Sequence, residues 1–580
     1  METTNLSKIR RDKMLNTINE IKKGITDEQT LTNLSMIENE LTKKKYGLIW
    51  EEHEERVDKE LETQIPTFED VKEKEIISNP DDKFNFLLEG DNLHSLYLLE
   101  KTHKEKIDVI YIDPPYNTGN KDFTYGDEQL SKEDEFRHSK WLSFMERRLK
   151  IAKNLLSDNG IIFISIDDNE QSTLKLLCDD IFSEQNFIAC IPRRTKSSGK
   201  TTNNISQNHD YLLIYEKTYN SSNIVSLPHI DEGFKYEDEY VETRGKYKLN
   251  QTLDYDSLGY SKSLDYPIII DGHTLYPGQS KELWLQRQKG NHKRADWAWR
   301  WSKDLYQFGY DNGFIVLKQS KNGYRIYTKT YMNAKIEKDN EKYKVVFSER
   351  TKPLSTLDLV NSNYSNDNAK KELLKIFQDS NFDYPKPTEL VKTILSIYGN
   401  KDGYILDFFA GSGTTAQAVL ELNKEDSGNR HFILCTNNEN KICENITYQR
   451  IKTVITGIRK DNSKYSDGIP TNLKYYKCTY IPRINTENED LHNNLLINIK
   501  NLIQLENGIE IDDKKIRVYL DEDELDIFSK NQNELDICEK VYISSDILLT
   551  QAQEKIFKNN NVEVYIIPEY YFEDEIMEVM

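Results

Sequence analysis

The segment VIYIDPPYNTGN at residues 109–120 holds the side chains whose types and order most clearly allow chemistry. β-prone residues lead to Asp113, whose carboxylate can accept a hydrogen bond, and the carbonyl of Pro114 offers a second acceptor. Pro115 fixes a backbone φ angle, so the two acceptors are preset, and Tyr116 adds a flat ring for stacking. Two acceptors beside a ring can hold a planar exocyclic amine. The alternative interpretation is an ordinary rigid turn after a strand.

A glycine-rich turn lies in the segment LDFFAGSGTT at residues 406–415, between a predicted strand and a predicted helix. Glycines allow the backbone to approach a ligand, and the N-terminus of a helix presents free N–H groups. A nucleotide triphosphatase would need a lysine after the last glycine to reach the phosphates, but Thr414 stands there instead. The turn therefore suits a ligand with a carboxylate and a ribose, unless it is a tight turn that binds nothing.

Polar residues also end the next predicted strand, HFILCTNNEN, where Asn437 and Glu439 follow the apolar run. An acidic residue in this position after a glycine turn is where such folds bind ribose hydroxyls. A solvent-exposed turn is the alternative explanation of Glu439 taken alone.

The elements that must position these motifs form two blocks of α/β character, at residues 84–217 and 376–465. Apolar runs without alternation predict buried strands, and amphipathic runs between them predict helices. Neither block alone has enough strands for a doubly wound parallel sheet. We therefore expect one sheet that is built from both blocks and interrupted by the segment between them. The predicted strands of the first block are FNFLLEG, IDVIYI, GIIFISI and YLLIYEK.

The remaining segments differ in texture. Residues 1–63 are predicted to be helices that pack on a partner chain or on the main body, and residues 64–83 are predicted to be a linker. Residues 218–375 are rich in tyrosine, glycine and asparagine, which indicates an irregular α+β insertion. Residues 466–580 are predicted to be an acidic α/β domain.

The whole chain has 580 residues, a net charge of −20 and 37% hydrophobic residues, as is typical of a soluble globular protein. It contains no run of about 18 apolar residues, so no membrane span is expected. Its six cysteines include no CxxC pair, which indicates reduced thiols in a cytoplasm rather than disulfides or a zinc site. We therefore expect a cytoplasmic protein without a bound metal.

The motifs DPPYNTG and FAGSGTT together resemble those of amino-methylating DNA methyltransferases, which use S-adenosylmethionine. DPPY implies adenine N6 as the acceptor, and its place before the glycine turn resembles the permuted beta class. More closely, the chain from about residue 84 to 485 resembles the Mod subunit of Type III restriction–modification systems. The segments that carry this resemblance are LLEGDNLHSLYLL, YIDPPYNTG, HDYLLIYEK, FDYPKPTELVKTIL, CTNNEN and NLKYYKCTYIP.

The resemblance implies a Rossmann-like, circularly permuted methyltransferase sheet with an inserted target recognition domain and a small C-terminal α/β domain. It implies that Asp113, Pro114, Pro115 and Tyr116 are catalytic. It directs Lys386 to the cofactor carboxylate and Asp407 to the cofactor amino group. The complete set of implied cofactor-binding residues is Asp91, Asn92, Asn117, Lys386, Asp407, Phe409, Gly411, Ser412, Gly413, Thr414, Asn437 and Glu439.

Basic residues collect at 193–200 and 285–303, so a chain that is acidic as a whole can still hold a basic groove. Within the second segment, Trp297, Trp299 and Trp301 alternate, either as a packed aromatic strand or as a wedge. The residues that we expect to contact DNA are Arg193, Arg194, Lys196, Arg287, Lys289, Lys293, Arg294 and Arg300.

By this resemblance, the protein transfers a methyl group from S-adenosylmethionine to N6 of a flipped adenine at specific sites in double-stranded DNA. The family implies a homodimer that partners a helicase–nuclease restriction subunit. A solitary regulatory DNA methyltransferase and an RNA methyltransferase are alternatives with related chemistry. A catalytically silent DNA-recognition or assembly subunit is a further alternative, although such a subunit would be expected to lose Asp113 or the glycines.

Overall fold

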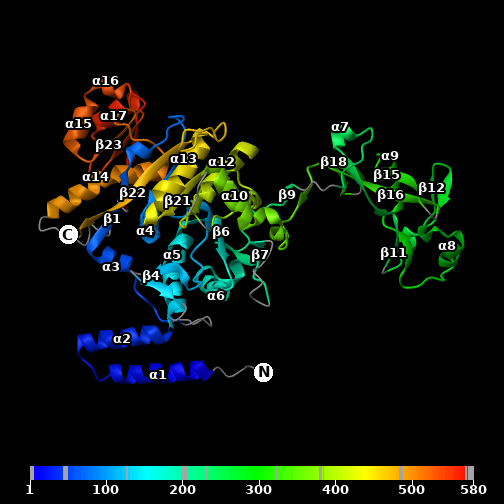
Figure 1. Cartoon of the computed structure of the whole chain (residues 1–580), viewed down its shortest axis with the longest axis horizontal. Coiled ribbons are helices and arrows are strands. Elements are labelled where there is room, and N and C mark those ends of the chain that lie inside the picture. Colours follow the sequence, from blue (N-terminus) through cyan, green and yellow to red (C-terminus); the bar gives the residue numbers. More distant parts are fainter. Residues whose placement is uncertain are drawn as a thin grey trace. The chain divides into compact units, whose positions relative to one another are not determined.

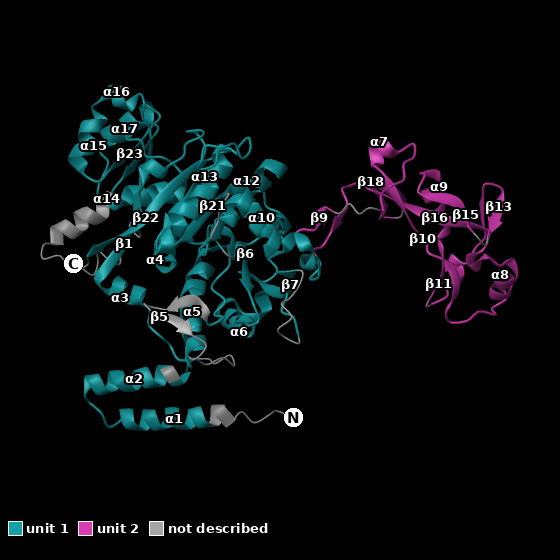
Figure 2. Cartoon of the chain, viewed as in Figure 1, with its two compact units in different colours: residues 1–224, 355–580 teal, residues 225–354 magenta. Residues whose placement is uncertain are grey.

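The protein consists of two compact units (Figure 1, Figure 2). Residues 1–224 and 355–580 form unit 1, and residues 225–354 form unit 2. Residues 218–224 and 355–375 thus belong to unit 1, so unit 2 is shorter at both ends than the predicted insertion. The computed structural model describes residues 6–42, 50–125, 128–131, 134–196, 205–228, 233–257, 259–320, 323–340, 342–377, 382, 384–482, 488–568 and 571.

Within the described residues of unit 1, a central sheet of nine strands combines both predicted α/β blocks, which confirms the prediction of a single sheet. Six neighbouring strands, from β22 to β6, run parallel, and antiparallel strands complete both edges. In order across the sheet, the strands are β1 (Gln64–Asp70), β22 (Asn472–Pro482), β2 (Phe84–Glu89), β21 (Asn429–Thr436), β20 (Asp402–Asp407), β3 (Ile107–Ile112), β6 (Leu156–Ile166), β8 (His209–Glu216) and β7 (Phe187–Arg194).

Helices cover this sheet in two groups. The helices α4 (Asn92–His103), α5 (Arg137–Leu155) and α6 (Gln171–Phe182) pack in series, and their apolar residues share one core with alternate strand residues such as Phe86 and Ile110. The helices α11 (Thr388–Tyr398), α12 (Thr414–Asp426) and α13 (Tyr448–Thr456) form the second series. Cover of this kind explains why the parallel strands are apolar without alternation.

Two predicted boundaries in unit 1 need correction. Residues 64–70 are not a linker but the edge strand β1, which pairs along its whole length with β22. The strand β22 in turn lies within the predicted C-terminal domain, yet it belongs to the central sheet. A separate small sheet follows later, after the helix α14 (Asn488–Asn507).

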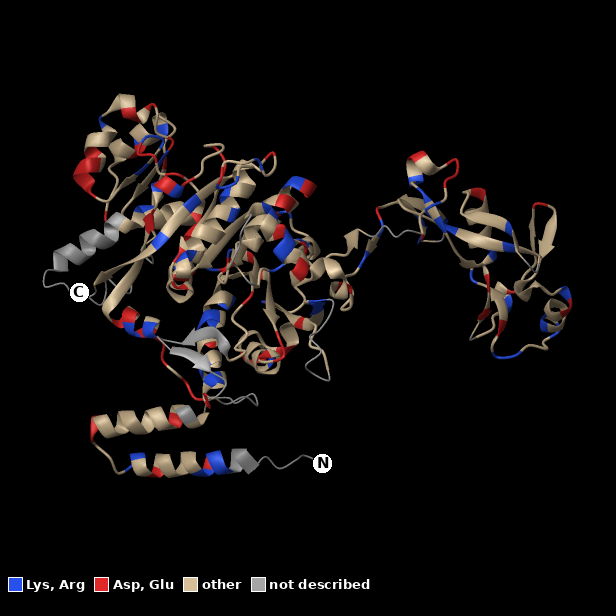
Figure 3. Cartoon of the chain, in the orientation of Figure 1, with Lys and Arg blue, Asp and Glu red and all other residues tan. Residues whose placement is uncertain are grey.

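The C-terminal part of unit 1 is a small α/β fold. Its strands β23 (Ile516–Tyr519), β24 (Lys540–Ile543) and β25 (Glu563–Ile566) are parallel. The helices beside them are α15 (Glu522–Ser529), α16 (Gln532–Leu535) and α17 (Gln551–Asn559), and acidic residues gather at the start of α15 (Figure 3).

The N-terminal part of unit 1 is helical, as predicted. The helices α1 (Leu6–Lys22) and α2 (Glu28–Thr42) contact each other, and Lys22 Nζ lies 2.6 Å from Glu38 Oε2. A third helix, α3 (Arg56–Thr63), leads into the edge strand β1. In the portion of the chain that the structure describes, no helix combines the length and apolar character that crossing a membrane requires.

Unit 2 is built from short antiparallel strands and three short helices in its described residues. Its core contains Leu253, Trp299, Tyr306 and Ile326, and the Trp299 indole N–H donates to the carbonyl of Tyr266 at 2.6 Å. Trp299 therefore belongs to the core, and the partly buried Trp301 packs against it, as in the packed aromatic strand of the two alternatives. One sheet has three strands, with β16 (Gly323–Tyr331) between β10 (Tyr247–Thr252) and β15 (Ile315–Ser320). The other described strands of unit 2 form pairs: β11 (Asp254–Ser257) with β14 (Asp296–Trp299), β12 (Ile268–Ile270) with β13 (His273–Leu275), β17 (Ala334–Asp339) with β18 (Lys342–Phe347), and β9 (Leu227–Pro228) with β19 (Thr351–Lys352). The helices are α7 (Val241–Arg244), α8 (Lys281–Gln288) and α9 (Lys303–Asp311).

Candidate active site

Four neighbouring parallel strands end at one edge of the central sheet. Because β2, β21, β20 and β3 run in the same direction, the residues that follow them come together there. They surround a cavity of about 440 Å³. Its lining residues are Glu55, Arg56, Val57, Asp91, Asn92, Asp113, Pro115, Phe144, Phe408, Phe409, Gly411, Thr436, Asn437, Glu439 and Ile442.

The glycine turn between β20 and α12 is part of this wall. Gly411 and Gly413 have φ angles of +49° and +76°, in the left-handed region that favours glycine. A Cβ atom at Gly411 would lie 3.6 Å from the nearest protein atom, on Phe382. The absent side chain therefore leaves space for a ligand rather than for neighbouring protein atoms.

A buried arginine organises the acidic side of the cavity. Arg148, on α5, is fully buried, and its two Nη atoms lie 2.7 and 3.1 Å from the carboxylate oxygens of Glu55. Its Nε donates to Asn92 Oδ1 at 2.6 Å, and its Nη2 lies 3.5 Å from Asp91 Oδ1. Arg148 thus orients three cavity residues, and we refer to these four side chains as the Arg148 network.

Asp113 faces the cavity from the end of β3, and its carboxylate is held by Lys386. The Lys386 Nζ lies 2.6 Å from both carboxylate oxygens and 4.8 Å from the centre of the Tyr116 ring. The prediction directed Lys386 to a cofactor carboxylate, but in the structure its partner is Asp113. Lys386 therefore contacts the Asp113 carboxylate and also lies near the face of the Tyr116 ring.

Tyr116 is fixed through a second buried ion pair. Its hydroxyl donates to Asp210 Oδ2 at 3.1 Å, and Asp210 is paired with Arg193 through both carboxylate oxygens. Burial and the nearby carboxylates raise the pKa of Tyr116, so its hydroxyl stays protonated. Arg193 is 1% exposed and also donates to the carbonyl of Tyr364 at 2.6 Å. The prediction that Arg193 contacts DNA is therefore wrong, because its guanidinium is used inside the protein.

Several predicted cofactor residues support the cavity without lining it. Asp407 is buried and accepts from the Phe409 backbone N–H at 3.0 Å and from the Thr415 hydroxyl at 2.5 Å. Burial raises the pKa of Asp407 to about 7. It therefore shapes the glycine turn, and the prediction that it faces an amino group of a cofactor does not match its position.

Ser412 and Thr414 are also turned inward. Both hydroxyls accept from Arg450, at 3.0 and 2.8 Å, and Arg450 is fully buried. Burial lowers the pKa of Arg450 to about 10. Asn117 is buried too, and its amide donates to Glu170 Oε1 at 2.5 Å. These three side chains stabilise the loops, which corrects their assignment as direct ligand contacts.

The sequence motifs missed the part of the cavity wall that comes from elsewhere in the chain. Glu55, Arg56 and Val57 lie at the start of α3, where no motif marks them. One signal was available, because Arg148 stands on the apolar face of α5 between Met145 and Leu149. A charged residue on such a face requires a buried partner.

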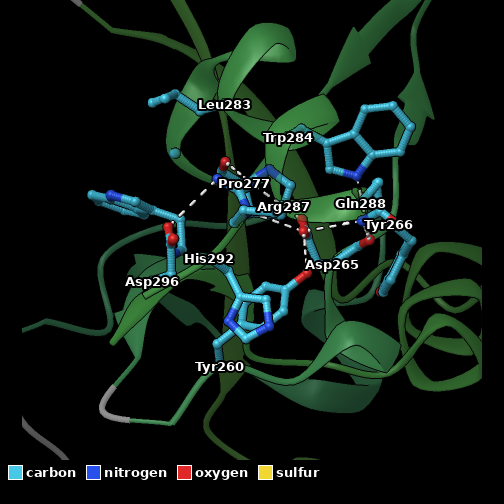
Figure 4. A network of polar contacts seen from close by, with 12 residues as sticks. Tyr260, Asp265, Tyr266, Pro277, Leu283, Trp284, Arg287, Gln288, His292 and Asp296 are labelled. Atoms are coloured by element: carbon cyan, nitrogen blue, oxygen red, sulfur yellow. Dashed lines mark hydrogen bonds and ion pairs between the residues drawn. The ribbon is translucent and has the colours of Figure 1, made fainter. Parts of the chain in front are cut away.

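The predicted DNA-contacting residues of unit 2 fall into two classes. Arg287 is 3% exposed, and its Nε lies 3.0 Å from Asp265 Oδ2, inside a network that also includes Tyr260 and Gln288 (Figure 4). The prediction that Arg287 contacts DNA is therefore wrong, because the buried pair ties α8 to a neighbouring loop. The other predicted DNA contacts of unit 2 are exposed: Lys289, Lys293, Arg294 and Arg300. In unit 1, Lys196 is exposed and Arg194 is half-buried.

Comparisons with known proteins agree with this architecture. A family model described as DNA methylase matches residues 107–449. The StyLTI Mod subunit of a Type III restriction–modification enzyme from Salmonella typhimurium is 33% identical over 448 residues, which are 70% of this chain and 62% of the relative. The EcoPI Mod subunit from Escherichia phage P1 is 32% identical over 450 residues, which are 71% of this chain and 66% of the relative.

The chain thus spans less than two thirds of the length of either Mod subunit. The Type II methyltransferase M.KpnI from Klebsiella pneumoniae is 34% identical over 405 residues, which are 68% of this chain and 90% of the relative. The StyLTI and EcoPI Mod subunits confirm the predicted resemblance to Type III Mod subunits. From the match to the family model and from M.KpnI, it follows that the chain belongs to the family of N6/N4 DNA methylases.

Proposed function

We propose that the protein transfers a methyl group from S-adenosylmethionine to N6 of adenine at a specific site in double-stranded DNA. The observation that carries this proposal is the position of Asp113. Its carboxylate lies in the wall of the same cavity as Gly411, Asn437 and Glu439. An acceptor for the target amine and a cavity for the methyl donor therefore share one edge of the sheet.

The cavity suits S-adenosylmethionine in volume and in chemistry. At about 440 Å³ it lies within the range of ligand pockets, which is about 300–1,000 Å³. Glu439 and Asp91 offer carboxylates to hydroxyl and amine donors, and Phe409 and Phe144 offer apolar surface. When bound, S-adenosylmethionine supplies an electrophilic methyl group. We propose that Asp91, Asn92, Phe409, Gly411, Asn437 and Glu439 hold it.

The DPPY motif would prepare the amine for attack. The lone pair of an exocyclic amine is delocalised into the ring, so the amine is a weak nucleophile. Hydrogen bonds from its two N–H groups to the Asp113 carboxylate and the Pro114 carbonyl favour a tetrahedral nitrogen with an available lone pair. Holding both reactants in place supplies much of the rate enhancement.

Lys386 and Tyr116 complete the proposed acceptor site. Lys386 orients the Asp113 carboxylate through its 2.6 Å contacts. Tyr116 can stack on an adenine that has left the helix, which repays about 1–3 kcal/mol of the cost of flipping. Its hydroxyl is anchored on Asp210, so the ring is held in place before the base arrives.

We further propose that unit 2, residues 225–354, recognises the target sequence. We also propose that the protein acts in the cytoplasm as a homodimer and that it partners a helicase–nuclease restriction subunit. The names of the two Mod subunits, which are parts of Type III restriction–modification enzymes, support the pairing with a restriction subunit. M.KpnI supports a second candidate, a methyltransferase that acts without such a partner, because this chain covers 90% of that Type II enzyme.

Sequencing that detects modified bases tests the proposal. DNA from cells that express the protein should carry N6-methyladenine in one short motif, and DNA from cells that express an Asp113→Asn variant should not. Co-purification of a helicase–nuclease from the native host would support the Type III assignment, whereas methylation by a protein that purifies without one would support the second candidate.

A further inference from the structure

A second cavity, of about 530 Å³, lies within unit 2 between β10, β16 and β17. Four cationic residues line it: Arg300, Lys329, Lys335 and Arg350. Two aromatic residues, Trp301 and Phe314, also line it, together with polar and aliphatic side chains. Among the described residues of unit 2, no Asp or Glu lines this cavity, although the chain carries a net charge of −20. We refer to it as the cationic cavity.

Arg350 is the clearest example of a cation in this cavity without an acidic partner among the described residues. Its guanidinium donates to the carbonyls of Tyr331 and Ala334, and no carboxylate among the described residues lies within ion-pair distance. Burial lowers the pKa of Arg350, which is the opposite of the effect of an anionic partner. Among the described residues, this half-buried guanidinium thus keeps its charge without a carboxylate partner, and a charge-assisted contact with an anionic ligand would suit it.

Arg300, which also lines the cavity, likewise has no carboxylate partner among the described residues. Its Nη2 donates to the amide oxygen of Gln251 at 2.8 Å, and its Cζ lies 4.5 Å from the centre of the Tyr255 ring. These neutral contacts fix the side chain without cancelling its charge. Arg287 differs, because Asp265 neutralises it in the core.

The other two cations are partly satisfied. Lys329 Nζ lies 2.5 Å from Asp238, and the exposed Lys335 lies 2.7 Å from Glu337. Together the four residues present two unpaired guanidinium groups and two shared ammonium groups around one hollow. Guanidinium groups match the oxygens of phosphate in a bidentate manner, and aromatic surfaces such as Trp301 pack against sugars or bases.

We propose that the cationic cavity binds the phosphodiester backbone of DNA, with Arg300 and Arg350 as the principal contacts. This inference rests on the proposed function, in which DNA is the substrate, and it assigns the phosphate contact to this cavity, which takes only Arg300 and Trp301 from the segment of residues 285–303. Phosphate contacts position a protein on the duplex and carry no sequence information directly. The cavity would therefore set affinity and register, and other side chains of unit 2 would read bases.

The test compares the affinity of purified variants for two duplexes, one that the wild-type protein methylates and one that it does not, across a series of NaCl concentrations. The principal variant is Arg300→Gln with Lys335→Gln, since both side chains are exposed and their loss should leave the fold intact. The matched control is Lys338→Gln with Lys342→Gln, which removes the same charge from exposed positions outside the cavity.

We expect the principal variant to bind both duplexes at least tenfold more weakly. The slope of log affinity against log salt should become smaller by at least about 0.9, the contribution of the one phosphate contact of Arg300. Lys335 should add less than a full contact, because Glu337 shares its charge. The control should change the slope by less than half as much. Arg350→Lys should weaken binding with little change in slope, since the charge stays and the fork is lost.

Equal slopes for the principal variant and the wild type would overturn the inference while the proposed function stands, because the wild type still methylates its duplex. If only the affinity for inorganic phosphate fell and duplex binding did not, the cavity would be a site for a free anion, which also overturns it. A wild-type protein that neither binds nor methylates duplex DNA would overturn the proposed function itself.

Discussion

Replacing Arg148 by methionine should damage both stability and cofactor binding, because one buried side chain supports three cavity residues. The substitution removes contacts of 2.7 and 3.1 Å to Glu55 and of 2.6 Å to Asn92. It leaves Glu55, which is 7% exposed, without its partner. Removing one member of a buried ion pair costs about 3–5 kcal/mol. That is a large share of the roughly 5–15 kcal/mol by which folded domains are stable.

Urea unfolding and calorimetry with S-adenosylmethionine measure the two effects. Arg148→Met should unfold at a clearly lower urea concentration and bind S-adenosylmethionine at least tenfold more weakly, a loss of about 1.4 kcal/mol or more. The matched control is Lys150→Met on the same helix, which removes an exposed 2.6 Å pair with Glu146. Such a pair contributes about 0.2–1 kcal/mol, so the control should behave like the wild type.

A double variant separates the contribution of the ion pair to stability from the contribution of apolar packing. Combining Arg148→Met with Glu55→Leu removes both charges, and replacing a whole buried pair by apolar residues is often neutral. The double variant should therefore recover part of the lost stability but not the affinity for S-adenosylmethionine. The reasoning is refuted if Arg148→Met unfolds at the wild-type urea concentration and binds the cofactor with unchanged affinity.

Three further predictions concern single side chains. Burial raises the pKa of Asp407 to about 7, so the folded protein loses stability as pH rises from about 4 to 7. Asp407→Asn should remove about 2–3 kcal/mol of the difference between unfolding free energies at pH 5 and pH 8, and an unchanged difference would contradict this. Gly411→Ala should fold, with about 1–2 kcal/mol of backbone strain, but lose tenfold or more in calorimetric affinity for S-adenosylmethionine. Lys386→Met should slow single-turnover methylation about tenfold or more while cofactor affinity stays within threefold, since it loses a charge-assisted contact to Asp113; an unchanged rate would contradict this role.

The elements that carry the two motifs were predictable because their signals are local. An apolar run that ends in Asp113 predicts a strand with a polar residue at its carboxyl end, and β3 ends there. The glycine turn after β20 is equally local, since Gly411 and Gly413 adopt φ angles that favour glycine. That both strands would share one sheet followed from counting strands in the two blocks.

The errors arise where a partner is distant in the sequence. The strand β1 mixes polar with apolar residues and contains Pro66, so its pairing with β22, about four hundred residues later, is what defines it. Arg287 and Lys289 look alike in the sequence, yet Arg287 is buried because Asp265, 22 residues earlier, pairs with it. Arg193 is buried for the same kind of reason, through Asp210. Burial of a charge depends on such partners, which composition does not reveal.

The most direct test of the central claim is nucleoside mass spectrometry of duplex DNA after incubation with the purified protein and S-adenosylmethionine that carries a labelled methyl group. We expect labelled N6-methyldeoxyadenosine with the wild-type protein and none with Asp113→Asn. The Asp113→Asn variant should still bind S-adenosylmethionine in calorimetry. Label in N4-methyldeoxycytidine, label in RNA but not in DNA, or full activity of Asp113→Asn would contradict the central claim.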